Sequence, residues 1–413
     1  MDDQPLGNGS PQKDIKVLYL ISSPEGDHPL DARTLGQPFL LAPSDPHSSL
    51  TLGHYFDSIH RFVFVENWDT FVAVLNESTK NKLDPADIRQ VLIRSEKHGA
   101  LYHLASIEVL APGFQMKFAL STGVSQRGKD WLNHEFEVIS ELNHATNLPY
   151  LPQVYFKGDV TCRTGNGDEI IVMSLAEWFG DHHEWHISLN EKEERQQILI
   201  WDQAKGYGYA SLQESHEIYL QASKILTLYY DIRTYSQIYP WHHGAGDFVV
   251  KREPGKIKVR LTTARKYEPV MVFEEEAQIN PFVALIYFFL NLTLQMRLDK
   301  LDGTGEVTWA EDWALNPVIE GFLDVFRIKE KQESDHPIEV NDLLTLLKGF
   351  SRDDLNSILD SLMDLHRRRD PEDYRILQSH LEDHGRAVFE GLRAERIEHS
   401  VKSKVEGSKS IKV

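Results

Sequence analysis

The chain has 413 residues, of which 41% are apolar and 26% charged, and this ordinary globular usage excludes a collagenous or a wholly disordered protein. Asp and Glu number 63 against 44 Lys and Arg, so the formal charge of −19 disfavours nucleic acid and anionic membrane surfaces as partners. The single cysteine, Cys162, excludes an internal disulfide and suits a reducing cytoplasm.

The first 90 residues predict a short polar end followed by an α/β segment. Residues 1–14 are polar without an apolar period, so we expect disorder there. Ile15–Ile21 is an apolar run that predicts a strand, and residues 24–58 are rich in turn formers and predict an extended loop. Arg61–Glu66 alternates like a strand, and a helix is expected to begin near Asp84. Together these elements form an N-terminal α/β segment over residues 15–90.

A β-rich small lobe is predicted over residues 91–175. Val91–Glu96, Tyr102–Leu110 and Phe114–Ser121 are strand-like runs joined by short turns, which is typical of an antiparallel meander. The first of these turns is His98–Ala100.

A helix is expected to follow the meander. Asp130 can cap it, and Leu132 and Ile139 recur at helical spacing. Glu135 falls on the same apolar stripe, and an acid that points toward a core needs a cationic partner. Two further strand candidates follow it, at residues 153–157 and 169–173.

A mainly helical large lobe is predicted over residues 176–399. It contains a long amphipathic helix at 217–235, then a polar loop, and then a hairpin of two short strands at 248–251 and 257–261. Further helices are expected at 281–298, 317–327, 338–348, 352–366 and 372–396. The most apolar run lies in the first of these and is shorter than the roughly 20 residues of a membrane span. We therefore expect a soluble, cytoplasmic protein, with a disordered tail over residues 400–413.

This order of elements resembles the kinase-like fold, most closely its aminoglycoside and choline phosphotransferase branch. The resemblance covers about residues 90–330 and is one of layout more than of motif. It implies an α+β, two-lobed fold, with a small antiparallel β lobe and a mainly helical lobe. It also implies that ATP and Mg²⁺ bind between the lobes and that the acceptor is a small molecule.

The resemblance assigns cofactor-binding roles to four residues. Gly99 would lie in the turn that covers the phosphates, and Lys117 would hold the α- and β-phosphates and pair with Glu135. The connector between the lobes would be Ser174–Glu177, so the backbone of Glu177 would meet the adenine edge.

The loop before the hairpin carries the residues that the resemblance makes catalytic. Asp247 falls where the family has a metal-binding Asn, and its carboxylate could hold Mg²⁺. His242 or His243 would serve as the base, because no Asp stands at the position of the family's catalytic base. The hairpin leads into Leu261–Arg265, which lacks the family's metal-binding Asp.

Three hypotheses follow from these residues. The first is an atypical nucleotide-binding phosphotransferase, and the second is a catalytically inactive kinase-like protein that binds or regulates a partner. The third is a metal-dependent enzyme, because His182, His183 and His186 lie beside two acids and imidazoles suit Zn²⁺ or Fe²⁺. The spacing of these histidines matches no established zinc motif, and hydrogen bonding to the backbone is the alternative for them.

Overall fold

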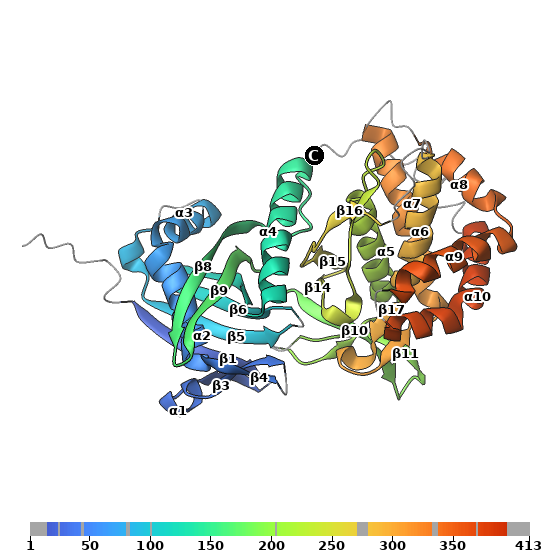
Figure 1. Ribbon diagram of the computed structural model, residues 1–413. Coiled ribbons are helices and arrows are strands. Elements are labelled where there is room, and N and C mark those ends of the chain that lie inside the picture. Colours follow the sequence, from blue (N-terminus) through green and yellow to red (C-terminus); the bar gives the residue numbers. More distant parts are fainter. Residues whose placement is uncertain are drawn as a thin grey trace, which may run out of the picture. The chain divides into compact units, whose positions relative to one another are not determined.

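The computed structural model describes residues 15–23, 25–42, 45–79, 83–99, 101–202, 205–270, 280–332, 338–368 and 371–394 (Figure 1). The chain is a mixed α/β protein with a large, mostly antiparallel sheet, as the sequence predicts. It divides into two compact units. Unit 1 comprises Met1–Asn147 and Pro152–Gly180, and unit 2 comprises Leu148–Leu151 and Asp181–Val413. The predicted disordered ends lie outside the described residues.

A seven-stranded sheet, in the order β2-β1-β5-β6-β7-β9-β8, forms the centre of unit 1. Its strands are β1 (Lys16–Ser23), β2 (Gly26–Pro29), β5 (Gln90–His98), β6 (His103–Ala111), β7 (Phe114–Gly123), β8 (Val154–Thr164) and β9 (Gly167–Glu177). The predicted meander is confirmed, because β5 pairs antiparallel with β6 and β6 with β7. Among the described strands of this sheet, β1 and β5 alone pair in parallel.

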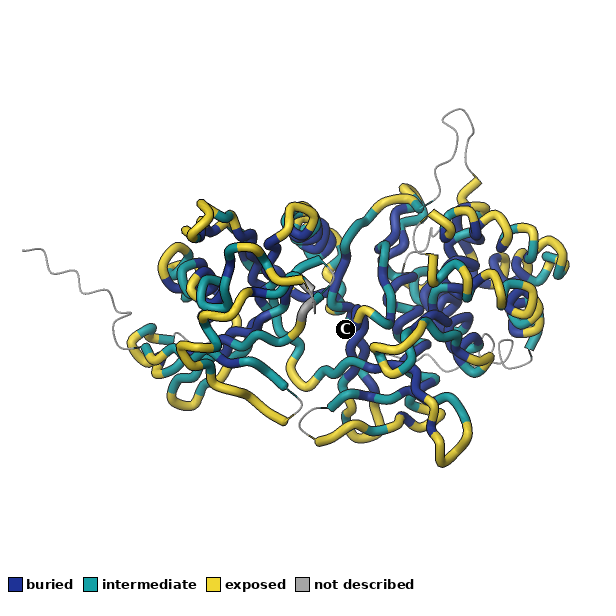
Figure 2. Tube along the Cα trace, turned by 60° about the horizontal axis from the view of Figure 1, so that its bottom comes forward, coloured by how far each residue is buried: buried dark blue, intermediate teal, exposed yellow. Residues whose placement is uncertain are grey.

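The core of unit 1 lies on one face of this sheet. Alternate residues of β6, such as Ile107 and Val109, pack with buried aromatic residues of three helical elements. These elements are α2 (Leu52–His60), η2 (Arg61–Glu66) and α3 (Trp68–Thr79). Figure 2 shows the buried residues of the chain in dark blue.

The prediction of a strand at Arg61–Glu66 is wrong, because this segment is one turn of π-helix. Phe62, Val63 and Phe64 are consecutive and all buried in one core, whereas consecutive residues of a strand point to opposite faces. The prediction of an extended loop over 24–58 is also wrong. That region holds β2, α1 (Ala32–Leu35), the hairpin of β3 (Pro38–Ala42) and β4 (Asp45–Thr51), and most of α2. The helix expected near Asp84 is the short η3 (Pro85–Asp87).

The helix α4 (Gln126–Thr146) follows β7 and contacts β7, β8 and β9. Its N-cap is Ser125, whose hydroxyl accepts a hydrogen bond from the backbone N–H of Gly128. The expected cap, Asp130, lies inside the first turns of the helix instead, where the Gln126 side chain donates to its carboxylate.

Unit 2 contains a five-stranded sheet in the order β12-β11-β10-β14-β15 and a set of helices. Its strands are β10 (His183–Asn190), β11 (Arg195–Ile200), β12 (Gly208–Tyr209), β14 (Phe248–Glu253) and β15 (Lys256–Leu261). Short pairs join β13 (Ser236–Ile238) to β16 (Tyr267–Pro269) and β17 (Leu298–Lys300) to β18 (Val307–Trp309). The predicted hairpin is confirmed as β14 and β15.

The helices of unit 2 are α5 (Leu212–Leu228), α6 (Pro281–Gln295), α7 (Leu315–Gln332), α8 (Val340–Gly349), α9 (Arg352–Arg367) and α10 (Pro371–Arg393). The five predicted after residue 280 are confirmed. The long helix predicted at 217–235 spans Leu212–Leu228 instead. It begins earlier because Ser211 and Glu214 form a capping box at its start. No helix within the described ranges combines the length and the apolar content that a membrane crossing requires.

Candidate functional site

Lys117 lies in the middle of β7, on the face of the sheet opposite the core of unit 1, because its neighbour Phe118 points into that core. The Nζ atom of Lys117 is 2.7 Å from the Glu96 carboxylate and 3.8 Å from the centre of the Trp178 ring. Its positive charge is therefore met by an acid and by an aromatic face within unit 1.

Charged residues continue across the same face. Glu96 also accepts a hydrogen bond from the Ser106 hydroxyl at 2.5 Å. Next to this group, Arg94 forms ion pairs with Glu108 at 2.5 Å and with Asp27 at 2.7 Å. Opposite charges thus meet across β5, β6 and β7, an arrangement that stabilises neighbouring strands.

Glu135 is buried on the apolar stripe of α4, as the sequence predicts. Its carboxylate accepts a hydrogen bond from the Tyr102 hydroxyl, in the chain segment just before β6. Lys117 and Glu135, the pair implied by the resemblance, thus lie against different partners, Glu96 and Tyr102.

Gly99 and Glu177 both use their backbone N–H groups inside unit 1. The N–H of Gly99 donates to the Tyr102 carbonyl at 3.1 Å, and a Cβ atom at Gly99 would lie only 2.6 Å from that oxygen, so the turn is tight. Its neighbour Ala100 lies outside the described residues. Glu177 ends β9, and its N–H donates to the Gln153 carbonyl at 2.7 Å.

The polar loop before β14 forms a compact corner of unit 2, and His242 begins its 3₁₀ turn, η4 (His243–Ala245). The Nδ1 atom of His242 accepts a hydrogen bond from the Gly244 N–H at 2.8 Å, and Nε2 lies 3.5 Å from the Asp373 carboxylate of α10. Burial opposes a charge on this imidazole, but Asp373, Asp299 and Asp247 together outweigh it and raise the pKa of His242.

Asp247 is 2% exposed, and Arg265 binds both of its carboxylate oxygens. The two guanidinium N–H groups each donate over 2.7 Å, and the His242 backbone N–H donates over 2.9 Å. This is the bidentate fork geometry in which arginine binds a carboxylate most strongly. Arg265 also donates to the Pro240 carbonyl at 3.2 Å, so it joins both sides of the corner.

His243 is buried among aromatic rings. Its ring centre is 4.6 Å from that of Trp185, 5.3 Å from Phe248 and 5.7 Å from Tyr219. Burial lowers the pKa of His243 to about 4, so the imidazole is neutral at pH 7. Within the described part of the chain neither of its ring nitrogens has a hydrogen-bond partner. A base in this position has no exposed surface through which to reach a substrate.

The histidines at residues 182–186 are spread along β10 and its start. His186 is buried, and its Nδ1 atom is 3.2 Å from Asp299, which also accepts backbone N–H groups from Ile187 and Lys300 at 2.8 and 2.7 Å. Burial opposes the charge on His186, but Asp299 and Glu184 raise its pKa to about 9. The described residues contain no group of three His, Cys, Asp or Glu side chains placed to hold a metal ion.

The sequence does not predict the roles of two of these partners, Arg265 and Asp299. Arg265 lies 18 residues after Asp247, and Asp299 lies 113 residues after His186. The only sequence signal for either pair is the charge itself. Of the predicted catalytic residues, the structure brings together Asp247 and His242, whereas His243 points into an aromatic interior.

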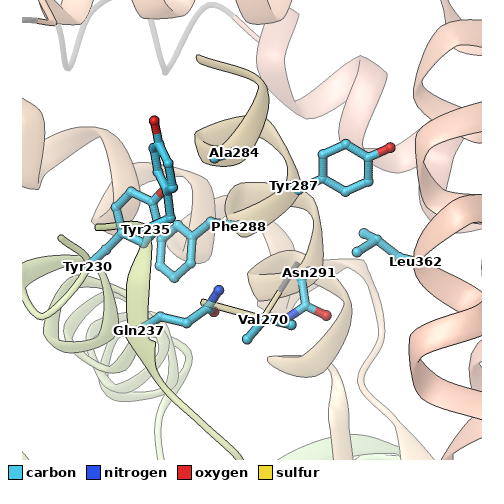
Figure 3. Close-up of a pocket in the computed structure, with 9 residues that line it drawn as sticks. All are labelled: Tyr230, Tyr235, Gln237, Val270, Ala284, Tyr287, Phe288, Asn291 and Leu362. Carbon is cyan, nitrogen blue, oxygen red and sulfur yellow. The ribbon is translucent and has the colours of Figure 1, made fainter. Parts of the chain in front are cut away.

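An aromatic pocket in unit 2 is shown in Figure 3. Tyr230 and Phe288 stack at 4.4 Å along one side of it, and the hydroxyl of Tyr287 points away from it, toward α9. Its open volume of about 10 Å³ has room for roughly one water molecule. The pocket is therefore too small for a nucleotide or for a small-molecule acceptor.

Comparisons with known proteins give no family for this chain: no family model matches it, and no curated protein matches it significantly.

Proposed function

We propose that this chain is a kinase-like protein that has lost phosphotransferase chemistry and acts by binding a partner. The layout of the elements supports the kinase-like part of the proposal. Five strands in the order β5-β6-β7-β9-β8 have a helix, α4, between the third and the fourth in sequence. A long helix, a polar corner and a hairpin then follow in unit 2, in the order implied by the resemblance.

The observation that carries the loss of chemistry is the bidentate pair between Arg265 and Asp247. A metal ion that bridges phosphates needs free carboxylate oxygens, and Arg265 is already within 2.7 Å of both oxygens of Asp247. A guanidinium remains charged at any physiological pH, so it competes with Mg²⁺ permanently. The buried carboxylate is well suited to fix the corner and poorly suited to hold a metal.

Two further observations support the same reading. The residues after β15 are Thr262 and Thr263, where the family has its second metal-binding acid. Lys117, the lysine assigned to the phosphates, is neutralised by Glu96 and covered on one side by Trp178. A nucleotide would have to displace the Glu96 carboxylate and the Trp178 ring before its phosphates could contact the Lys117 ammonium group.

The test is a thermal-shift titration of the full chain with ATP, with and without Mg²⁺, together with a phosphate-release assay. We expect no phosphate release above the buffer rate and no stabilisation that depends on Mg²⁺. Three results together would contradict the proposal. Mg²⁺ would raise the melting temperature beyond the shift caused by ATP alone, Asp247→Asn would abolish this extra shift, and phosphate release would be measurable. The control variant is Asp364→Asn, which changes an exposed acid of the same unit.

A further inference from the structure

A second cavity of unit 2 lies at the end of α6, beside the segment from β18 to η6 (Asp312–Ala314) and beside α10. Its volume is about 250 Å³, close to the lower end of small-molecule sites. All of its lining residues belong to unit 2 and come from these three parts of the fold. None of them takes part in the proposed loss of phosphotransferase chemistry.

The floor of the cavity is the guanidinium of Arg297, which is 3% exposed. Its Nε atom donates to the Ala310 carbonyl at 2.8 Å, and its Nη2 atom donates to Asp312 at 2.8 Å. Its Cζ atom lies 4.6 Å from the centre of the Trp309 ring. The charged group is thus held in one orientation before any ligand arrives.

His384 forms the other part of the floor and is also buried. Thr293 donates its hydroxyl proton to the Leu290 carbonyl at 2.8 Å, so it accepts a hydrogen bond from the Nε2–H of His384 at 3.1 Å. The Nδ1 atom of His384 is then an acceptor, and it lies 3.5 Å from Nη1 of Arg297. Burial and the charge of Arg297 both lower the pKa of His384, so the imidazole adds no second charge.

The sign of the charge reverses between the floor and the mouth of the cavity. The partner of Arg297, Asp312, has a side chain that is 80% exposed, so water screens it and it compensates the buried cation weakly. Glu311 and Asp383 are also exposed at the mouth, and Asp383 is paired with Arg386 at 2.6 Å. The floor therefore carries a buried positive charge. The opening carries three carboxylates and one guanidinium, that of Arg386, so its formal charge is −3 + 1 = −2.

One wall of the cavity is aromatic. Trp309 and His380 lie parallel, with ring centres 5.2 Å apart and an interplanar angle of 1°. Burial and the charge of Arg297 lower the pKa of His380, so this imidazole is neutral as well. The wall thus offers an apolar surface beside the charged floor.

We propose that this cavity binds a small zwitterion of the amino-acid class. The ligand's carboxylate lies at Arg297, whose planar guanidinium suits a carboxylate, and its ammonium group lies at the acidic mouth. Its side chain packs along Trp309 and His380. A simple anion would meet the net negative charge of the opening, and a simple cation would meet the buried Arg297, so both fit less well than a molecule that carries both charges.

Calorimetric titration of the full chain with leucine, phenylalanine, glutamate and lysine tests the proposal, alongside the N-acetyl derivative and the amide of each. We expect at least one free amino acid to bind about tenfold or more tightly than either of its capped forms, because each cap removes one charge-assisted contact. Absence of binding by all four amino acids at about 10 mM, or equal binding of the capped forms, would overturn the proposal.

Variants at the mouth connect binding to this cavity and leave the buried floor intact. We expect Asp383→Asn and Glu311→Gln each to weaken binding by about threefold or more without lowering the melting temperature. The matched control is Glu382→Gln, which changes an 83% exposed acid on the same helix. Affinities that remain unchanged in both mouth variants would place the ligand elsewhere and overturn the assignment. The result is independent of the ATP and Mg²⁺ test, which concerns other residues.

Discussion

Replacing Arg265 by methionine removes the partner of a buried acid. The Arg265→Met chain loses the two hydrogen bonds to Asp247 and the one to the Pro240 carbonyl, and it leaves the carboxylate uncompensated at 2% exposure. Breaking a buried ion pair in this way costs about 3–5 kcal/mol of unfolding free energy. Because Arg265 itself is partly exposed, we expect a value near the lower end, about 3 kcal/mol.

Urea denaturation of unit 2 within the full chain, followed by tryptophan fluorescence and circular dichroism, measures this loss. The control is Arg252→Met, which removes an ion pair with Glu214 at 3.0 Å that is open to solvent and is worth about 0.5 kcal/mol. The double variant Arg265→Met/Asp247→Leu leaves no buried charge, so we expect it to be more stable than Arg265→Met alone. A loss of stability in Arg265→Met no larger than that in Arg252→Met would contradict a buried, uncompensated charge at Asp247. So would a double variant that is less stable than Arg265→Met.

Three further predictions concern pH and packing in unit 2. Because the pKa of His186 is raised to about 9 from an unfolded value near 6.5, the stability that this residue adds to the folded chain is complete below about pH 6.5 and is lost as the pH rises through 9. The stability difference between wild type and His186→Gln should therefore shrink over that interval. A constant difference would contradict the assignment. The pKa of His243 is lowered to about 4 in the folded chain, so as the pH falls the unfolded chain binds this proton before the folded chain does. Wild type should therefore lose more stability than His243→Phe between about pH 6.5 and 4. Gly303→Ala places a Cβ atom 2.6 Å from the His186 ring, whereas the Cβ atom of Gly255→Ala, at a similar positive φ, meets nothing within 4 Å. Gly303→Ala should therefore lower the melting temperature by several degrees more than Gly255→Ala does. Equal shifts would argue against this packing.

The periodic parts of the fold could be predicted from the sequence. The strands β5, β6 and β7 alternate, and the helices from α6 to α10 have apolar residues at helical spacing, so local pattern alone was sufficient. Residues 61–66 also alternate, yet they form a π-helix in which three successive side chains are buried. Local pattern does not predict the strand β10, because its polar residues are buried against distant partners. His186, for example, contacts Asp299, which lies 113 residues later in the chain.

The candidate site could be predicted only in part. Asp247 and His242 are five residues apart and share a turn-rich segment, so their proximity followed from the local sequence. The pairing of Asp247 with Arg265 depends on how the hairpin of β14 and β15 returns to the corner. Lys117 was assigned by resemblance, and its contact with Glu96 requires the register of β5, β6 and β7. The pairing of charges that are distant in sequence depends on strand topology and register, which the local pattern of a single sequence does not reveal.

The parallel pairing of β1 with β5 determines where this protein can be truncated. In a fragment that starts at residue 90, β5 would be an exposed edge strand with unpaired backbone N–H and C=O groups, which could pair with a strand of another chain. It would also remove the aromatic residues of α2, η2 and α3 that cover Ile107 and Val109, so an apolar sheet face would become accessible to water. Expression of unit 1 on its own should therefore begin no later than Ile15, and shorter versions should aggregate.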